Sequence, residues 1–243
     1  LSGAHHVEIR SLYRCGNVPL LTMGGGYDST LFYPAENKRK EGPVRILYAG
    51  KIDPTKGIFA LIQAFLTLQE QDDGLRLSIV GAPNQTYGLQ LDRLLAGNAH
   101  IQLLPPMPQA QLANTMREHD VFVLPSFYEG LGLIAVEALA CGLWTVSTEI
   151  EGLVSLLGQS VVDSGAIALV PLPKAEGSAV PYSRQLQGFM QSLGQKIALQ
   201  VESARKGTGF PASAAKDILE YSWKKIGERL HSILINGSTE GER

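Results

Sequence analysis

From Val44 onward, short apolar runs alternate at regular spacing with stretches of helical pattern. Such alternation is typical of βαβ units, which build a parallel sheet with right-handed crossovers. It predicts an α/β fold, a doubly wound, Rossmann-like sheet that binds ligands at the carboxyl ends of its strands. Six strands are expected, at Val44–Ala49, Leu75–Val80, His100–Leu104, Asp120–Leu124, Trp144–Thr148 and Ile167–Val170. Helices are expected between them at 58–68, 89–95, 110–118 and 133–140.

Composition indicates an ordinary globular protein that can bury a substantial core. The 243 residues are 44% hydrophobic and 18% charged, with a formal net charge of -2, which argues against a nucleic-acid binder. The two cysteines, Cys15 and Cys141, cannot form a disulfide framework and fit a reducing compartment. Neither has a metal-ligand neighbour at a useful spacing, and no apolar run reaches the ~18 residues that a transmembrane helix needs.

The stretch from Pro125 to Gly142 carries the most chemistry, and it reads PSFYEGLGLIAVEALACG. An apolar strand precedes it and a run of good helix formers follows, so it is expected to be a strand, a glycine-bearing turn and a helix. The unpaired N–H groups and the positive dipole end of such a helix suit a phosphate or a sugar oxygen. Gly130 and Gly132 would let a ligand approach the backbone closely. Glu129 in the turn and Glu137 in the helix would stand roughly 10 to 12 Å apart, about the reach of a nucleoside diphosphate.

Each part of this stretch also has an ordinary structural interpretation. Glycine-bearing strand–turn–helix units occur throughout doubly wound proteins, and a single helix glutamate such as Glu137 is more often solvated. The two carboxylates placed around Gly-Leu-Gly-Leu favour a functional site. Here the sequence resembles the retaining glycosyltransferases of family four, whose signature is Glu, seven residues, Glu. Leu131 stands where that family usually has Phe, and Leu139 where it has Met.

The loop after the first strand, Gly50 to Gly57, carries two cations, Lys51 and Lys56, on either side of a turn that opens the next helix. Taken alone, a lysine is nearly always a solvated surface residue. The resemblance implies instead that both lysines hold the diphosphate of a sugar donor, since the family typically has Gly-Arg-x-x-x-x-Lys-Gly here. Lys51 replaces the usual Arg, which keeps the charge and loses the bidentate fork.

The resemblance also implies where the base and the sugar of the donor lie. The base would sit between the loop at Gly81 and the loop at Leu104, Pro105 and Pro106, held mainly by backbone groups, and the sugar near Glu149 to Ser155. In that last stretch Glu151 and Ser155 depart from the family's Gly-Gly-x-x-Glu. The pair His119-Asp120 could pass for catalytic partners, and a satisfied structural pair at a strand entrance is the interpretation we favour.

The ends of the chain are assigned as follows. Residues 1–42 are expected to be the remnant of an N-terminal lobe and a hinge, with a strand at Val18–Met23, a positive-φ turn at Gly24–Asp28 and a polar linker from Glu36 to Gly42. The hinge rests on a resemblance carried by Gly26, Asp28, Phe32 and Pro34. Residues 43–205 would form the nucleotide-sugar-binding domain. Residues 206–235 would be helices that pack back toward the other lobe, and 236–243 a frayed tail.

Tyr182 to Leu234 reads as amphipathic helix with a break at Gly207 to Pro211. We expect the last helix to present a large apolar patch around Trp223, on the surface that would face the other lobe. A plain alternative is that Trp223 is a core anchor.

The resemblance implies the donor-binding lobe of a two-lobed (GT-B) enzyme that moves a hexose from a UDP- or GDP-linked sugar to a sugar or lipid-linked acceptor. Lys51, Lys56 and the helix start at Gly130, Leu131, Gly132 and Leu133 would stabilise the leaving diphosphate. Glu137 would bind the ribose and Glu129 the transferred sugar. No metal or other cofactor is expected, and the location would be cytoplasmic, peripheral at the inner face of a membrane in the full-length protein. By itself this chain should bind donor and transfer nothing.

Two other classes of function stay open at this stage. One is a doubly wound module that binds a nucleotide without chemistry, and the other is a sugar-nucleotide epimerase or a phosphorylase on the same architecture. No Gly-x-Gly-x-x-Gly opens a strand–helix unit, which argues against a dinucleotide dehydrogenase.

Overall fold

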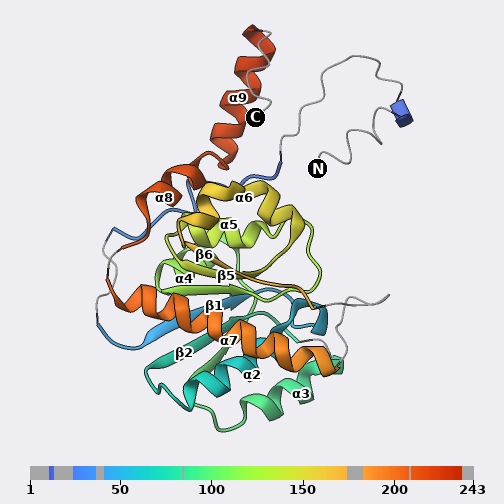
Figure 1. Ribbon diagram of the computed structural model, residues 1–243, viewed down its shortest axis with the longest axis vertical. Helices are drawn as coiled ribbons and strands as arrows, with labels where there is room; N and C mark the ends of the chain where they lie inside the picture. The colour runs from blue at the N-terminus through green and yellow to red at the C-terminus, as the bar shows by residue number, and fades with distance from the viewer. Residues whose placement is uncertain are drawn as a thin grey trace.

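The computed structural model describes residues 11–13, 24–36, 41–83, 85–173, 183–207 and 209–236. Its centre is a sheet of six parallel strands in the order β3-β2-β1-β4-β5-β6 (Figure 1). The strands are β1 (Val44–Ala49), β2 (Leu75–Val80), β3 (Ile101–Leu104), β4 (Val121–Leu124), β5 (Trp144–Thr148) and β6 (Ile167–Val170). All six expected strands are confirmed, and two begin one residue later than expected. The strand order reverses between β1 and β4, which is where doubly wound sheets open a crevice for a ligand.

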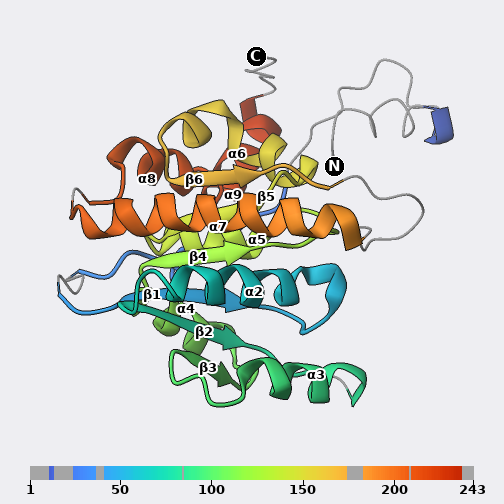
Figure 2. The ribbon, with the colours of Figure 1, turned by 60° about the horizontal axis from the view of Figure 1, so that its bottom comes forward.

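Helices cover both faces of this sheet. On one face lie α2 (Ile58–Gln69), α3 (Gln85–Leu95) and the long α7 (Ser183–Arg205), which runs along α2 and crosses several strands (Figure 2). On the other lie α4 (Gln109–Arg117), α5 (Leu133–Ala140), α6 (Glu151–Asp163) and α8 (Ala212–Leu219). The short 3-10 helix η1 (Pro54–Lys56) precedes α2, and α9 (Trp223–Asn236) projects from the body (Figure 1).

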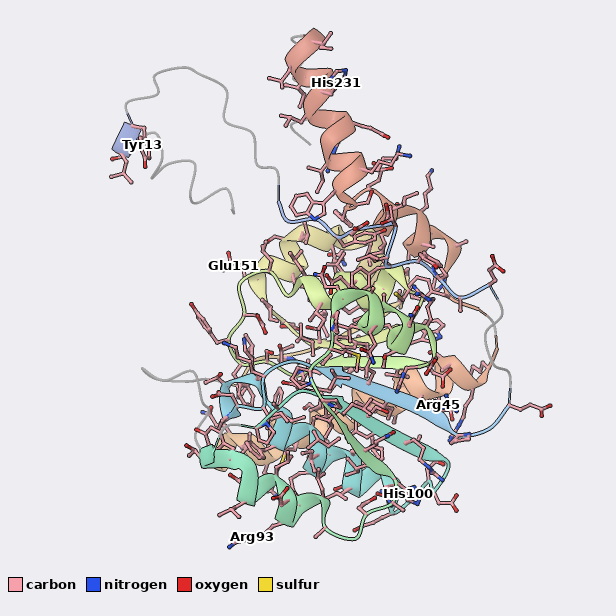
Figure 3. All side chains as sticks on the ribbon, turned by 180° about the vertical axis from the view of Figure 1, so that it is seen from behind. Tyr13, Arg45, Arg93, His100, Glu151 and His231 are labelled. Carbon is pink, nitrogen blue, oxygen red and sulfur yellow. The ribbon has the colours of Figure 1, made fainter. Side chains whose placement is uncertain are left out.

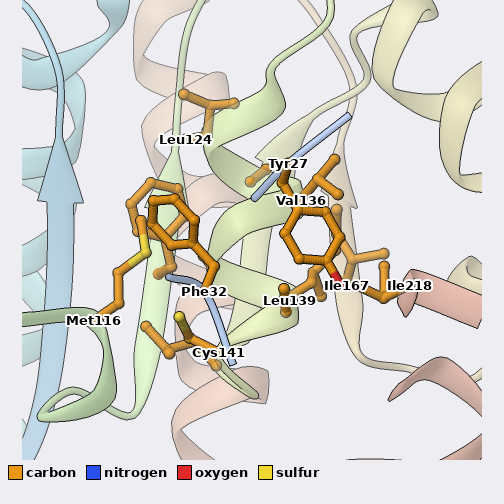
Figure 4. Packing of buried hydrophobic residues seen from close by; sticks show 14 of the residues in the cluster. Tyr27, Phe32, Met116, Leu124, Val136, Leu139, Cys141, Ile167 and Ile218 are labelled. Atoms are coloured by element: carbon orange, nitrogen blue, oxygen red, sulfur yellow. The ribbon is translucent and has the colours of Figure 1, made fainter. Parts of the chain in front are cut away.

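The sheet has a core on each face because successive side chains of a buried strand point to opposite sides. In β1, Leu47 and Ala49 belong to the core under α5, whereas Ile46 and Tyr48 belong to the core under α2 and α7. All four are buried. Figure 4 shows part of the first core, in which Phe32, from the segment before β1, packs among residues of α4 and β4. The apolar run of β4, Val121–Leu124, in which every residue is buried, follows from this two-sided burial.

Helix α6 was not predicted, since no element was assigned between Thr148 and Ile167. Its sequence, EGLVSLLGQSVVD, contains two glycines and two serines, which weaken a helical pattern. The helix is kinked at Gly158, whose φ of 68° lies in the left-handed region. The hydroxyl of Tyr221 donates to the carbonyl of Leu157 at 2.8 Å and so satisfies a group that the kink frees.

The segment from Gly24 to Glu36 is fastened to the domain rather than free. Tyr27 forms a parallel bridge with Ser222. Its N–H donates to the carbonyl of Tyr221, the residue before Ser222, and its carbonyl accepts from the N–H of Trp223, the residue after it. The Tyr27 and Phe32 side chains are buried, and burial raises the pKa of Tyr27 to about 12. Gly24 has a φ of 65°, as the expected turn requires. The expected strand at 18–23 and most of residues 1–42 lie outside the described residues.

The C-terminal third is helical, with the expected break at Gly207 to Pro211 lying between α7 and α8. A second break, between α8 and α9, was not predicted. Three large apolar side chains of α9, those of Trp223, Leu234 and Ile235, are more than half exposed. The expected tail beyond residue 236 lies outside the described part. Within the described residues, no helix is both long enough and apolar enough to cross a bilayer.

Candidate functional site

The loops that follow β1 and β4 lie side by side at the point where the strand order reverses. The N–H of Phe127 donates to the carbonyl of Thr55 at 2.8 Å. A β-carbon added to Gly57 would stand 1.9 Å from the carbonyl oxygen of Pro125, and Gly57 has a φ of 65°. Only glycine fits a left-handed backbone at such close approach. Gly57 therefore lets the two loops meet.

The first of these loops is shaped by its own side chains. The Asp53 carboxylate accepts hydrogen bonds from the N–H of Thr55 at 2.8 Å and from its hydroxyl at 2.6 Å. These bonds hold the pKa of Asp53 below its usual range, and the charges of Lys56 and Lys51 add to the effect. Pro54 opens η1 and Gly57 closes it, so that Lys56 is the last residue of the turn. The turn thus fixes the position from which Lys56 reaches toward β4.

Lys56 and Glu129 are in direct contact. Lys56 Nζ lies 2.8 Å from Glu129 Oε1 and also donates to the carbonyl of Tyr128 at 3.0 Å. The Ser126 hydroxyl donates to the same carboxylate oxygen at 3.1 Å. Both charged side chains are about one quarter exposed, at 23% and 24%. The structure therefore brings together two residues to which the sequence assigned separate roles.

Lys51 stands at the rim of this group with its side chain exposed. Its carbonyl accepts a hydrogen bond of 2.6 Å from the hydroxyl of Tyr48, which fixes the chain as it leaves β1. Burial raises the pKa of Tyr48 well above its usual range, and the nearby carboxylates of Glu129 and Asp53 contribute, so this hydroxyl stays a donor. Sequence reasoning missed Tyr48 and Ser126 because each lies in an ordinary apolar or turn context.

The N-terminus of α5 is open on one side and packed on the other. Gly132 is its N-cap, with a φ of 59° and no side-chain cap, so the first N–H groups of the helix have no capping side chain. The start of α6 presses against the loop, since a β-carbon on Gly152 would lie 2.1 Å from the carbonyl oxygen of Gly130. A β-carbon on Gly130 itself would meet nothing within 4 Å. Gly130 thus leaves an accessible backbone face beside Glu129.

Glu137 lies in the second turn of α5 and is partly buried. Burial raises the pKa of this carboxyl from 4.5 to about 7, because a charged carboxylate loses hydration there. Strongly shifted carboxyls gather at functional sites, although structural groups also show such shifts. Near neutral pH Glu137 can therefore act either as a hydrogen-bond donor or as an acceptor.

The neighbouring edge of the sheet contains the residues expected to hold a base. Gly81 N donates to Leu104 O at 3.0 Å, and Gly50 N donates to Val80 O at 3.0 Å. A β-carbon on Gly81 would lie 2.3 Å from the carbonyl oxygen of Gly50, so the backbones that leave β1 and β2 are in contact. Pro105 follows β3 and is exposed. Gly81, Leu104 and Pro105 are thus gathered at the carboxyl ends of β2 and β3, next to the Lys51 loop.

The His119-Asp120 pair lies at the amino end of β4, at the opposite end of the strands from the loops described above, and each member has structural partners. His119 Nδ1 is 2.7 Å from Thr115 O and its Nε2 is 2.8 Å from Ser78 Oγ, and burial lowers the pKa of the ring. Asp120 accepts from the N–H of Arg45 at 2.9 Å. In Figure 3 Arg45 lies on the right and Glu151, at the start of α6, on the left. The described residues hold no cluster of His, Cys, Asp and Glu that could bind a metal ion.

Comparison with known proteins gives a consistent picture. A family model described as "Glycosyl transferases group 1" matches residues 30–175. A D-inositol 3-phosphate glycosyltransferase of Mycobacteroides abscessus is 28% identical over 221 residues, which is 85% of this chain and 44% of that protein. One of Geodermatophilus obscurus is 39% identical over 151 residues, 55% of this chain and 33% of that protein.

The fold is shared with solved structures. The pneumococcal O-GlcNAc transferase GtfA, solved in complex with UDP and GlcNAc, superposes with a TM-score of 0.68 at 19% identity, over 96% of this chain and 43% of that one. The match shows a common fold. The chain spans less than half the length of each of these three proteins.

Proposed function

The chain belongs to the group 1 glycosyl transferases, and from this premise we propose that it is the donor-binding half of an enzyme that transfers a hexose from a nucleotide sugar. The donor would be a UDP- or GDP-linked sugar. The acceptor would be a sugar or a lipid-linked sugar held by another lobe, and the anomeric configuration would be retained. A cytoplasmic location, peripheral at the inner face of a membrane in the full-length protein, is part of the same proposal.

The observation that carries this proposal is the contact between Lys56 and Glu129 at the switch point of the sheet. Ligands of doubly wound sheets bind there, outside the carboxyl ends of the strands. The contact puts a cation suited to a diphosphate next to a carboxylate suited to sugar hydroxyls. In a nucleotide sugar the diphosphate and the sugar are joined by one bond, and that bond is the one that breaks in transfer.

In the proposed mechanism the bond between the anomeric carbon and the diphosphate oxygen breaks, and negative charge grows on the diphosphate. Lys51, Lys56 and the N–H groups at Gly130 to Leu133 would stabilise that charge, since preorganised donors are most effective where charge develops. Glu129 would hold the hydroxyls of the sugar. Glu137 would accept hydrogen bonds from the ribose, and the backbone at Gly81, Leu104 and Pro105 would contact the base.

The solved relative that contains UDP supports a uridine donor as the first candidate to test. The curated relatives are named for D-inositol 3-phosphate, which makes an inositol phosphate a reasonable member of any acceptor panel.

The test is a binding panel on the 243-residue chain. UDP, GDP, ADP and the corresponding hexose nucleotides are titrated by calorimetry, and unfolding is followed by thermal shift. A ligand at a hundred times its dissociation constant adds ~2.7 kcal/mol to the free energy of unfolding. Stabilisation by one family of nucleoside diphosphates is the expected result, and no response to any of them would contradict the proposal. Transfer assays with the full-length enzyme then separate a transferase from a nucleotide-binding module, an epimerase or a phosphorylase.

A further inference from the structure

Three consecutive glycines, Gly24 to Gly26, pass between the α5 loop and helix α9. A β-carbon on Gly25 would lie 2.9 Å from Leu131 Cδ1, and 2.9 and 3.1 Å from the two δ-carbons of Leu133. A β-carbon on Gly26 would lie 2.7 Å from Ile226 Cδ1 and 2.9 Å from the Trp223 ring. The neighbouring glycines therefore touch different parts of the molecule, one the loop before α5 and the other helix α9.

Backbone conformation does not explain Gly25 or Gly26. Among the glycines in this run, the left-handed φ belongs to Gly24 alone. Both Gly25 and Gly26 are buried. At these two positions an alanine could adopt the backbone angles, and what it would disturb is the contact. Distances of 2.9 Å are shorter than carbon atoms tolerate, so the leucines facing Gly25 would have to move.

The two leucines that Gly25 contacts lie at the start of α5. Leu131 and Leu133 flank Gly132, the N-cap of α5, and follow Gly130, whose accessible backbone face stands beside Glu129. The start of α6 also packs against this loop, through the close approach of Gly152 to Gly130. Gly25 and the start of α6 thus both pack against this loop.

We propose that Gly25 is a positioning residue of the donor site: it acts through Leu131 and Leu133 to set where the N–H groups at the start of α5 stand. The inference rests on the proposed function, because it assigns the diphosphate to those N–H groups. It also links the segment before β1, which is fastened to α9 through Tyr27 and Ser222, to the affinity for donor. A shift of the two leucine side chains that reaches the backbone between them would weaken several of the proposed hydrogen bonds to the diphosphate at once.

The experiment compares Gly25→Ala with Gly26→Ala in the 243-residue chain. Hydrogen–deuterium exchange, measured without ligand, should rise at residues 129–135 in Gly25→Ala and at residues 222–230 in Gly26→Ala. Calorimetry with UDP and GDP should show the Kd of the nucleoside diphosphate that binds increased about tenfold in Gly25→Ala and less than twofold in Gly26→Ala. Affinity for the free nucleoside should change little in either variant.

A rescue experiment separates positioning from general loss of packing. In the background Leu131→Ala/Leu133→Ala, which removes the atoms that meet the new methyl group, Gly25→Ala should have no further effect on the Kd. Equal exchange at 129–135 in wild type and Gly25→Ala, or equal diphosphate affinity in the two, would overturn the inference. If the wild type binds neither UDP nor GDP, the proposed function fails for those ligands. The exchange measurement needs no ligand, so unchanged exchange at residues 129–135 in Gly25→Ala would by itself reject the role of Gly25 in positioning the loop.

Discussion

Lys56 Nζ lies 2.8 Å from Glu129 Oε1 although the two residues are 73 positions apart in the chain. The contact joins the loop after β1 to the loop after β4 across the point where the sheet reverses its order. The two side chains are only partly exposed, and an ion pair that solvent still reaches contributes about 0 to 1 kcal/mol to stability. Lys56 can therefore exchange its partner for a diphosphate at low cost, and removing either member should affect ligand binding more than folding.

The first prediction concerns Lys56. Lys56→Ala should weaken binding of a nucleoside diphosphate by ~1.5 to 3 kcal/mol, because a charge-assisted hydrogen bond to phosphate is lost and Glu129 is left without its cation. Binding of the free nucleoside should be almost unchanged. Calorimetry with both ligands makes the comparison, and Lys51→Ala, at the rim, should give a smaller loss. An equal loss for nucleoside and diphosphate would show that Lys56 does not contact the diphosphate.

The second prediction separates the two glutamates. Glu129→Ala should weaken a nucleotide sugar by ~1 to 3 kcal/mol, because its proposed partners are the sugar hydroxyls, and should leave the free diphosphate at equal or higher affinity, because Lys56 is released. Glu137→Ala should weaken both ligands alike, since both contain the ribose. Paired titrations of the two variants decide the matter. A loss of diphosphate affinity in Glu129→Ala as large as that in Glu137→Ala would reverse the proposed orientation of the donor.

The third prediction is a pH dependence of stability. The pKa of Glu137 is about 7 in the folded protein and 4.5 as its ordinary value, so the folded state holds a proton that the unfolded state has lost between these pH values. The stabilisation is complete below pH 4.5 and is lost as the pH rises through about 7. Relative to Glu137→Gln, which does not titrate, the free energy of unfolding should fall by roughly 1 to 2 kcal/mol over this window, with allowance for partial exposure. Urea unfolding at a series of pH values measures it, and a flat difference would contradict the shift.

The fourth prediction contrasts two glycines of the site. Gly57→Ala should destabilise the fold by ~2 kcal/mol or more, because its φ is 65° and its β-carbon would meet the Pro125 carbonyl. Gly130→Ala should change stability by less than ~0.5 kcal/mol, because nothing lies within 4 Å of the new methyl group. It should nevertheless weaken diphosphate binding, since the methyl would occupy the face proposed for the phosphate. Thermal unfolding and calorimetry test both, and unimpaired binding by Gly130→Ala would place the phosphate elsewhere.

The strands could be predicted from the sequence because most of their residues are buried and apolar, as in Val121 to Leu124. Helix α5 was equally clear, since LIAVEALA is rich in strong helix formers. Helix α6 was not, because Gly152 is kept for its close approach to Gly130 and Gly158 for a kink that Tyr221 supports. These glycines serve tertiary contacts, and such contacts leave no periodic signal in the local sequence.

The site shows the same division. The sequence located Lys51, Lys56 and Glu129 in loops at strand ends and Glu137 in the helix that follows, and the structure brings the two loops together at the carboxyl ends of β1 and β4. The ion pair between Lys56 and Glu129 could not be read from the sequence, because it depends on β1 and β4 being neighbours. The raised pKa of Glu137 depends on how deeply α5 is buried, and the helix propensity of its residues does not predict that depth. Contacts between distant segments are decided by topology, and the roles of individual side chains follow from them.

The last prediction is that these 243 residues bind donor and transfer no sugar. Much of the rate of a two-substrate reaction comes from holding the reactants together with water excluded, worth up to ~7 to 11 kcal/mol of the barrier. The residues proposed to bind the donor lie at the carboxyl ends of the strands of a single sheet. The two curated relatives are more than twice as long as the part that they share with this chain. We assign the acceptor to that further length, and the exposed Trp223, Leu234 and Ile235 of α9 to the surface that meets it. Donor hydrolysis and transfer are measured side by side on this chain, with the full-length enzyme as control, and robust transfer by these residues alone would show that the acceptor site lies within them.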